Sequence, residues 1–114
     1  RINRSVEALP WARSAVEREP KNFAYLDTLG QVLLETGDAL EAETHLRKSF
    51  QLLKRVGTLV GLARALAAQG RYLEAAATGE EAIALSKGSW PPNERPEEEV
   101  RQWIAYWKAS VPSA

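Results

Sequence analysis

The sequence predicts an all-α fold in which antiparallel helix pairs stack into a solenoid. One observation is a hexapeptide that occurs twice: residues 37–42 read Gly-Asp-Ala-Leu-Glu-Ala, and residues 70–75 read Gly-Arg-Tyr-Leu-Glu-Ala, an offset of 33 positions. A second is that the surrounding leucines share this offset, since Leu33 aligns on Leu66. A unit of this length cannot bury its apolar face alone and must stack on a neighbour.

The third observation is helical spacing of apolar residues throughout the chain, which predicts about six helices. The first occupies residues 5–19. Proline lacks a backbone N–H and is tolerated only in or near the first turn, so this helix either starts close to Ser5 or restarts at Leu9. Pro20 ends it, because the residue before a proline is pushed out of the helical region.

The next two helices form the first full pair. Asn22 is a suitable N-cap for a helix over residues 23–36, and Gly37 ends that helix in the left-handed conformation. Asp38 then caps a helix that runs to about residue 54, with Glu41 as the reciprocal member of a capping box. The following break falls at Gly57 and Thr58. We expect four large residues on the inner side of this helix: Leu40, Leu46, Phe50 and Leu53.

The second pair repeats this plan. Leu59 opens the core pattern of a helix that ends near residue 69, Gly70 breaks it, and its partner covers residues 72–87. Residues 88–96 contain three prolines and form a rigid connector. A last helix spans residues 96–110, with acidic residues at its start, where the positive end of the helix dipole favours them.

Composition excludes several classes of function. There are 15 basic and 15 acidic residues, so the basic excess that phosphate binding requires is missing and we expect no nucleic-acid partner. Cysteine is absent, which excludes disulfides and thiolate metal sites. No apolar run is long enough to cross a bilayer. The chain begins at Arg1 with no methionine or signal-peptide pattern, and we expect it to be a piece of a longer protein.

The two pairs resemble tetratricopeptide repeats (TPR), whose pattern places large residues and small residues at fixed positions of two helices. The small positions hold Gly30 or Ala63, Ala42 or Ala75, and Ser49 or Ala82. The leucines of the pattern are Leu26, Leu29, Leu33 and Leu46 in the first unit and Leu59, Leu62 and Leu66 in the second. The resemblance implies a right-handed solenoid.

Three departures from the family pattern affect this interpretation. Lys54 and Lys87 stand where the family has proline, and Gly79 replaces a large residue, which leaves a gap that another group must fill. The repeat pattern also stops after residue 88, so we take the last helix as a capping helix. The chain is then one domain over residues 1–114, divided into a half repeat (5–20), two repeats (23–55 and 56–88) and a capping helix (96–110).

TPR domains hold peptides or partner helices in a concave groove lined by the first helix of each unit. The resemblance therefore implies a partner-binding groove here. The lysine and asparagine by which one TPR subset grips a terminal carboxylate are missing from the matching positions. Arg64 is the fixed positive charge available in the groove, unless it is an ordinary solvated arginine paired with Glu35 or Asp27. The groove residues would be Asp27, Gln31 and Leu34 from one helix and Val60, Arg64 and Ala67 from the next.

The role of each tryptophan can be interpreted in more than one way. Trp103 and Trp107 lie on one face of the last helix and either cover the end of the solenoid, filling space near Gly79, or dock on a partner. Trp11 lies on a helix whose own partner helix is missing, so an apolar patch there would support homo-oligomers. Trp90, in the connector, is ambiguous.

His45, the single histidine, lies one turn from Glu41 and from Ser49. Three residues along one helix do not converge in a pocket as a nucleophilic triad must, so we expect no catalytic site. One imidazole with scattered carboxylates also lacks metal-ligand spacing. No cofactor motif is present.

We therefore expect a non-enzymatic module that binds a peptide or helix of a partner protein. Two alternatives stay open. The chain could be a spacer or self-assembly segment of a longer repeat protein, or the regulatory appendage of a multidomain enzyme.

Overall fold

The structure, a computed structural model, describes residues 4–112 and consists of six helices with no β-strand in that range. The all-α prediction and the number of helices are confirmed for these residues. In chain order the helices are α1 (Arg4–Arg18), α2 (Phe23–Thr36), α3 (Ala39–Leu52), α4 (Val56–Ala68), α5 (Tyr72–Ser86) and α6 (Glu97–Ser110).

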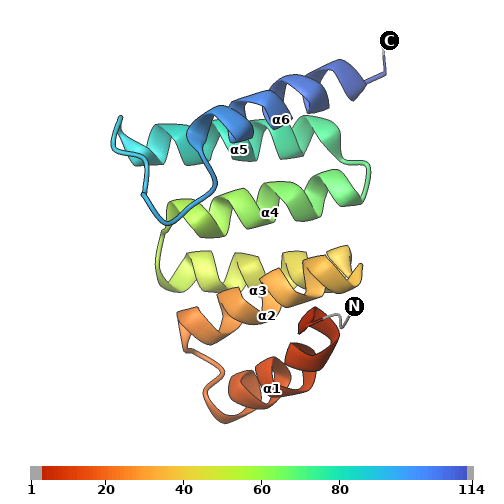
Figure 1. Cartoon of the computed structure of the whole chain (residues 1–114), viewed down its shortest axis with the longest axis vertical. Coiled ribbons are helices and arrows are strands. Elements are labelled where there is room, and N and C mark those ends of the chain that lie inside the picture. The colour runs from red at the N-terminus through yellow and green to blue at the C-terminus, as the bar shows by residue number, and fades with distance from the viewer. Residues whose placement is uncertain (1–3, 113–114) are drawn as a thin grey trace.

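Each helix packs against the helix that follows it in the chain, and successive helices run in opposite directions (Figure 1). The α2 and α4 helices also touch each other, although α3 lies between them in sequence. The result is an elongated stack measuring 43 × 29 × 28 Å, with α1 at one end and α6 at the other (Figure 1).

The repeated hexapeptide forms the same turn twice. Gly37 and Gly70 adopt φ angles of 96° and 77°, a left-handed conformation that glycine adopts without a Cβ penalty. After each glycine, the next backbone N–H donates to the carbonyl five residues earlier, from Asp38 to Leu33 at 2.8 Å and from Arg71 to Leu66 at 3.0 Å. This is the Schellman arrangement that ends helices, so the predicted role of Gly37 is confirmed.

The predicted N-cap at Asn22 is also confirmed. Its side-chain oxygen accepts hydrogen bonds from the backbone N–H groups of Ala24 and Tyr25 at 2.9 and 3.1 Å. Asp38 occupies the predicted N-cap position of α3, but its side chain makes no capping hydrogen bond, so the predicted capping box is not formed. Glu41 instead accepts two hydrogen bonds from the guanidinium of Arg13 in α1, so this carboxylate ties two helix pairs together.

One further helix boundary differs from the prediction. The break between α3 and α4 lies at residues 53–55, because Leu53 and Arg55 have extended backbone conformations. Gly57 and Thr58, which we placed in the break, belong to the first turn of α4. Of the two starts considered for the first helix, the one close to Ser5 agrees with the structure, because α1 begins at Arg4 and continues to Arg18 without a restart at residue 9. Pro10 is the seventh residue of this helix.

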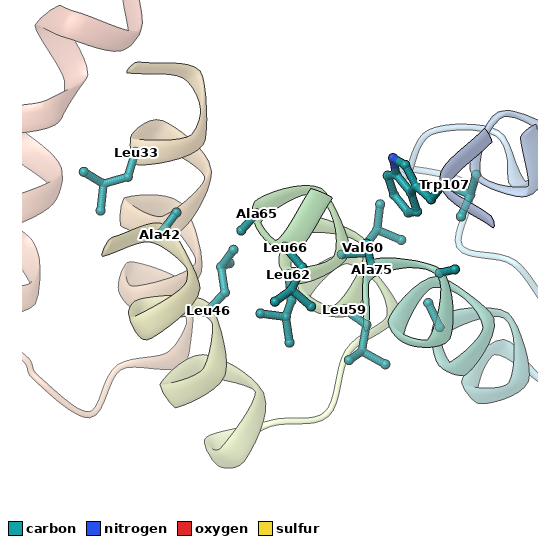
Figure 2. Packing of buried hydrophobic residues seen from close by; sticks show 14 of the residues in the cluster. Leu33, Ala42, Leu46, Leu59, Val60, Leu62, Ala65, Leu66, Ala75 and Trp107 are labelled. Carbon is teal, nitrogen blue, oxygen red and sulfur yellow. The ribbon is translucent and has the colours of Figure 1, made fainter. Parts of the chain in front are cut away.

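A single apolar core runs through the stack, and Figure 2 shows its residues filling the space between successive helices. Small residues occur where helices approach most closely: a Cβ on Gly30 would lie 2.5 Å from the side chain of Leu46. Leu40 and Leu53, expected inside, are exposed. Leu40 precedes the buried Ala42 by two residues, about 200° around the helix, so the two residues face opposite ways.

The gap predicted at Gly79 is filled by α6. A Cβ on Gly79 would lie 2.7 Å from a side-chain carbon of Ile104, and Trp107 is the next nearest side chain. Both α6 residues are buried. The α6 helix therefore packs on α5 through the space that the missing large side chain leaves.

Candidate binding site between α2, α4 and the α5–α6 connector

Four of the six predicted groove residues line one pocket. Asp27 and Gln31 come from α2, and Val60 and Arg64 come from α4. Val60 contributes little surface, since only 4% of it is exposed. The other two, Leu34 and Ala67, are half-buried residues that pack against the core and do not line the pocket.

The remaining wall of the pocket comes from a segment that the sequence analysis did not assign to a site. The connector between α5 and α6 reaches back to the start of α4 (Figure 1) and contributes Glu94 and Arg95. Gly57 and Gly61 complete the lining of a cavity of about 180 Å³. These glycines are four residues apart and therefore share one face of α4, and this spacing in the sequence could have indicated that other segments pack closely against that face.

Acidic groups gather at the first turn of α4. Asp27 accepts a hydrogen bond from the hydroxyl of the buried Thr58 at 3.2 Å, and Arg55 lies 3.7 Å from the same carboxylate. The Glu94 carboxylate lies where a side chain of Gly57 would be, only 2.1 Å from an ideal Cβ there. The N-terminal end of a helix carries partial positive charge, so both carboxylates lie in a favourable field.

The side-chain amide of Gln31 occupies the middle of the pocket. The Gln31 side chain lies across Gly61, with its nitrogen 2.4 Å from where a Cβ would be, and donates to Asp27 at 3.2 Å. Any larger residue at position 61 would displace this amide from the α2–α4 seam.

Two guanidinium groups gather around one indole at the other end. Arg64 and Arg95 lie over the ring of Trp103, 5.7 and 5.2 Å from its centroid. Burial lowers the pKa of Arg64, and repulsion from Arg95 acts in the same direction, whereas Glu35 and Glu99 oppose the change. An arginine remains charged at neutral pH all the same. Arg64 is thus a positioned, half-buried cation, and Glu35 is one of the two carboxylates that we considered as its partner.

The tryptophans now have definite positions. Trp107 is buried against α5, and Trp103 forms the stacking surface just described, so both are engaged within the chain. Trp90 closes the connector, because its indole N–H donates to the carbonyl of Arg95 at 2.7 Å. Trp11 is 56% exposed at the α1 end and touches only the edge of Tyr25 among aromatic side chains of residues 4–112.

The residues around His45 do not form a nucleophilic site. The Ser49 hydroxyl is fully buried and donates to the carbonyl of Phe23 at 2.8 Å, so it faces α2. The Nε2 atom of His45 lies 3.5 Å from Glu41, whose carboxylate is already bound by Arg13. The described part of the chain contains no group of three or more potential ligands positioned to hold a metal ion.

Comparison with known proteins leaves the chain without a family assignment. No protein-family model matches it, and no curated protein matches it. None of the helices within residues 4–112 is long and apolar enough to span a membrane. The structure therefore defines a class, an all-α stack of helix pairs with a small charged pocket.

Proposed function

We propose that this chain is a non-enzymatic protein-interaction module of the TPR type. In this proposal α2–α3 and α4–α5 are two full repeats of a right-handed solenoid, α1 is the second half of a preceding repeat, and α6 is a capping helix. A peptide or helix of a partner protein binds against the first helices of the two repeats.

One observation carries the proposal: polar residues of α2 and α4 converge on the same pocket although they come from different units. Asp27 and Val60 are separated by 33 positions, as are Gln31 and Arg64, and all four line the cavity. At these positions the two units carry different residues, whereas their core and turn residues are alike. Two repeat units that share their core and turn residues keep the same fold, and different residues at their pocket positions allow the pocket to be specific for one ligand.

A second candidate, self-assembly through the ends of the stack, is favoured by exposed apolar residues there. Trp11 and Val6 on α1 are 56% and 57% exposed, and Tyr106 on α6 is 67% exposed. Aromatic residues are common anchors of protein interfaces, so end-to-end stacking of two copies would bury such side chains.

Two sets of variants separate these functions. The purified chain is used to select binders from a displayed library of short peptides, and selected peptides are then titrated against the Arg64→Glu variant. We expect affinity to fall by at least about tenfold, because a cation in the pocket wall becomes an anion. The matched control is the end pair Trp11→Ser with Tyr106→Ser, which should leave peptide affinity unchanged.

The same variants are examined by sedimentation velocity. If the wild-type chain associates, if the end pair abolishes that association, and if no selected peptide depends on Arg64, then the assembly function replaces the groove function.

A further inference from the structure

We propose that the pocket recognises two opposite charges on one partner polypeptide, a basic side chain bound near Gly57 and an acidic side chain bound beside Trp103. This inference rests on the proposed function and specifies the chemistry of its ligand. The partner segment is in the polyproline II conformation, with the two charged residues three positions apart.

The basic side chain of the partner is bound by Glu94. This carboxylate lies in the pocket wall against Gly57 and forms no ion pair or side-chain hydrogen bond with any residue between 4 and 112. Its neighbour across the first turn, Asp27, accepts from Thr58 and Gln31 and lies near Arg55, so its position is fixed. A lysine or arginine of the partner would complete the coordination of Glu94 with a charge-assisted hydrogen bond.

The acidic side chain of the partner is bound by Arg64 and Arg95. Both guanidinium groups are held against the same ring and repel one another, while Glu35 and Glu99 attract Arg64 and offset part of that repulsion. The Glu99 carboxylate approaches Arg95 only to 3.5 Å. An incoming carboxylate between the two cations relieves their repulsion, and arginine offers planar paired donors that suit a carboxylate.

The distance between these two ends sets the spacing of the ligand. Arg64 lies seven residues after Gly57, which corresponds to roughly 10 Å along α4 at 1.5 Å per residue. A polyproline II segment rises about 3.1 Å per residue and has three residues per turn, so side chains three positions apart span about 9 Å and lie on the same face. Two carboxylates and two guanidiniums line the cavity, so a ligand with charges of one sign only meets repulsion at one end.

Blocked synthetic peptides test this inference directly. The probes share one host of glycine and serine and differ in their charged positions: Lys-Ala-Ala-Glu, the single-charge Lys-Ala-Ala-Gln and Gln-Ala-Ala-Glu, and the neutral Gln-Ala-Ala-Gln. Each is titrated into isotope-labelled protein, and amide shifts of Gly57 and Gly61 and the indole shift of Trp103 are followed. We expect the doubly charged probe to bind at least about tenfold more tightly than the other three.

Variants of the connector identify the groups responsible. Glu94→Gln should bring the doubly charged probe to the affinity of Gln-Ala-Ala-Glu, and Arg95→Gln should weaken it by a similar factor. Glu94→Lys should reverse the preference at one end, so that Glu-Ala-Ala-Glu becomes the tightest probe. The matched controls are Glu98→Gln and Lys48→Gln, which change exposed charges outside the pocket.

The inference is overturned if the neutral probe binds as tightly as the doubly charged one, or if the doubly charged probe leaves the three reporter signals unmoved. Neither result touches the proposed function, which fails only when library-selected peptides bind independently of Arg64.

Discussion

Gly30 and Ala63 occupy matching positions in α2 and α4, yet only the first has no room for a methyl group. In the first unit, the side chain of Leu46 lies where a Cβ of Gly30 would be. In the second unit, the position of Leu46 is taken by Gly79, so Ala63 does not face a leucine there. The first unit thus pairs a small residue with a large one, whereas the second unit has two small residues at the same positions. Side chains of α6 fill the space that the missing large residue leaves.

Replacing Gly30 with alanine should destabilise the protein. Alanine is favoured in a helix by about 1 kcal/mol over glycine, but overpacking a core typically costs about 1–3 kcal/mol. The contact is with the branch of a fully buried leucine, so we expect overpacking to dominate, with a net loss of about 1 kcal/mol in the free energy of unfolding. Urea denaturation measures this loss.

The control for this prediction is Gly57→Ala, in which the three atoms nearest to the added methyl all belong to the movable end of Glu94. Equal stabilisation by both substitutions would mean that the approach of α2 to Leu46 is not tight.

At the scale of the helices, a buried carboxylate joins α3 to the α4–α5 turn. Glu43 accepts hydrogen bonds from Gln69 at 2.9 Å and Arg71 at 2.8 Å, and from Arg47 on its own helix at 2.9 Å. Burial acts to raise the pKa of Glu43, but these donors outweigh it and hold the pKa below that of an ordinary glutamate. The pKa of Glu41 is also lowered, chiefly by its hydrogen bond with Arg13.

These lowered pKa values predict acid sensitivity. A carboxyl whose pKa is lower in the folded state binds fewer protons there than in the unfolded chain, so its stabilisation is complete above about pH 4.5 and is lost as the pH falls through the folded-state pKa. We expect the free energy of unfolding, measured in urea at successive pH values, to fall below pH 4.5.

Glu43→Gln should make this decline shallower, while Glu98→Gln, an exposed change outside the network, is the control. An unchanged slope in Glu43→Gln would place the acid sensitivity elsewhere.

The contact between α5 and α6 gives a second prediction at this scale. Gly79→Ala should destabilise the protein by about 1–3 kcal/mol, because the new methyl overlaps Ile104. Ile104→Ala alone should cost about 2–4 kcal/mol through the cavity it leaves. The double variant should lose less than the sum of the two, since removing Ile104 makes room for the methyl. A double-mutant cycle by chemical denaturation measures the difference, and strict additivity would contradict this packing.

At the scale of the whole molecule, the repeat explains the stack but not the pocket. Turn residues act locally: at Gly37 and Gly70 the chain reverses through backbone hydrogen bonds between residues three to five positions apart. Such features can be read from sequence, and they were. The exposure of Leu40 and Leu53 was missed, because which face of α3 is buried depends on helices distant in sequence.

The connector is the clearest case of a feature beyond the repeat pattern. Residues 88–96 match neither unit, and three prolines indicate only that the segment is stiff. Its return to the first turn of α4 depends on contacts between residues far apart in the chain, such as Glu94 with Gly57. No periodicity records such contacts, so Glu94 and Arg95 could not be assigned to the site in advance.

The sequence by itself determined that residues 4–112 form six helices, with glycine turns inside both full pairs, because helical spacing and glycine turns act within a few residues. Only the tertiary structure decided that Arg64 is stacked on Trp103, that Ile104 fills the space at Gly79, and that the connector closes the pocket. The physical reason is that these features depend on the packing of segments from different helix pairs, where the volume or charge of one residue is matched by a residue distant in sequence.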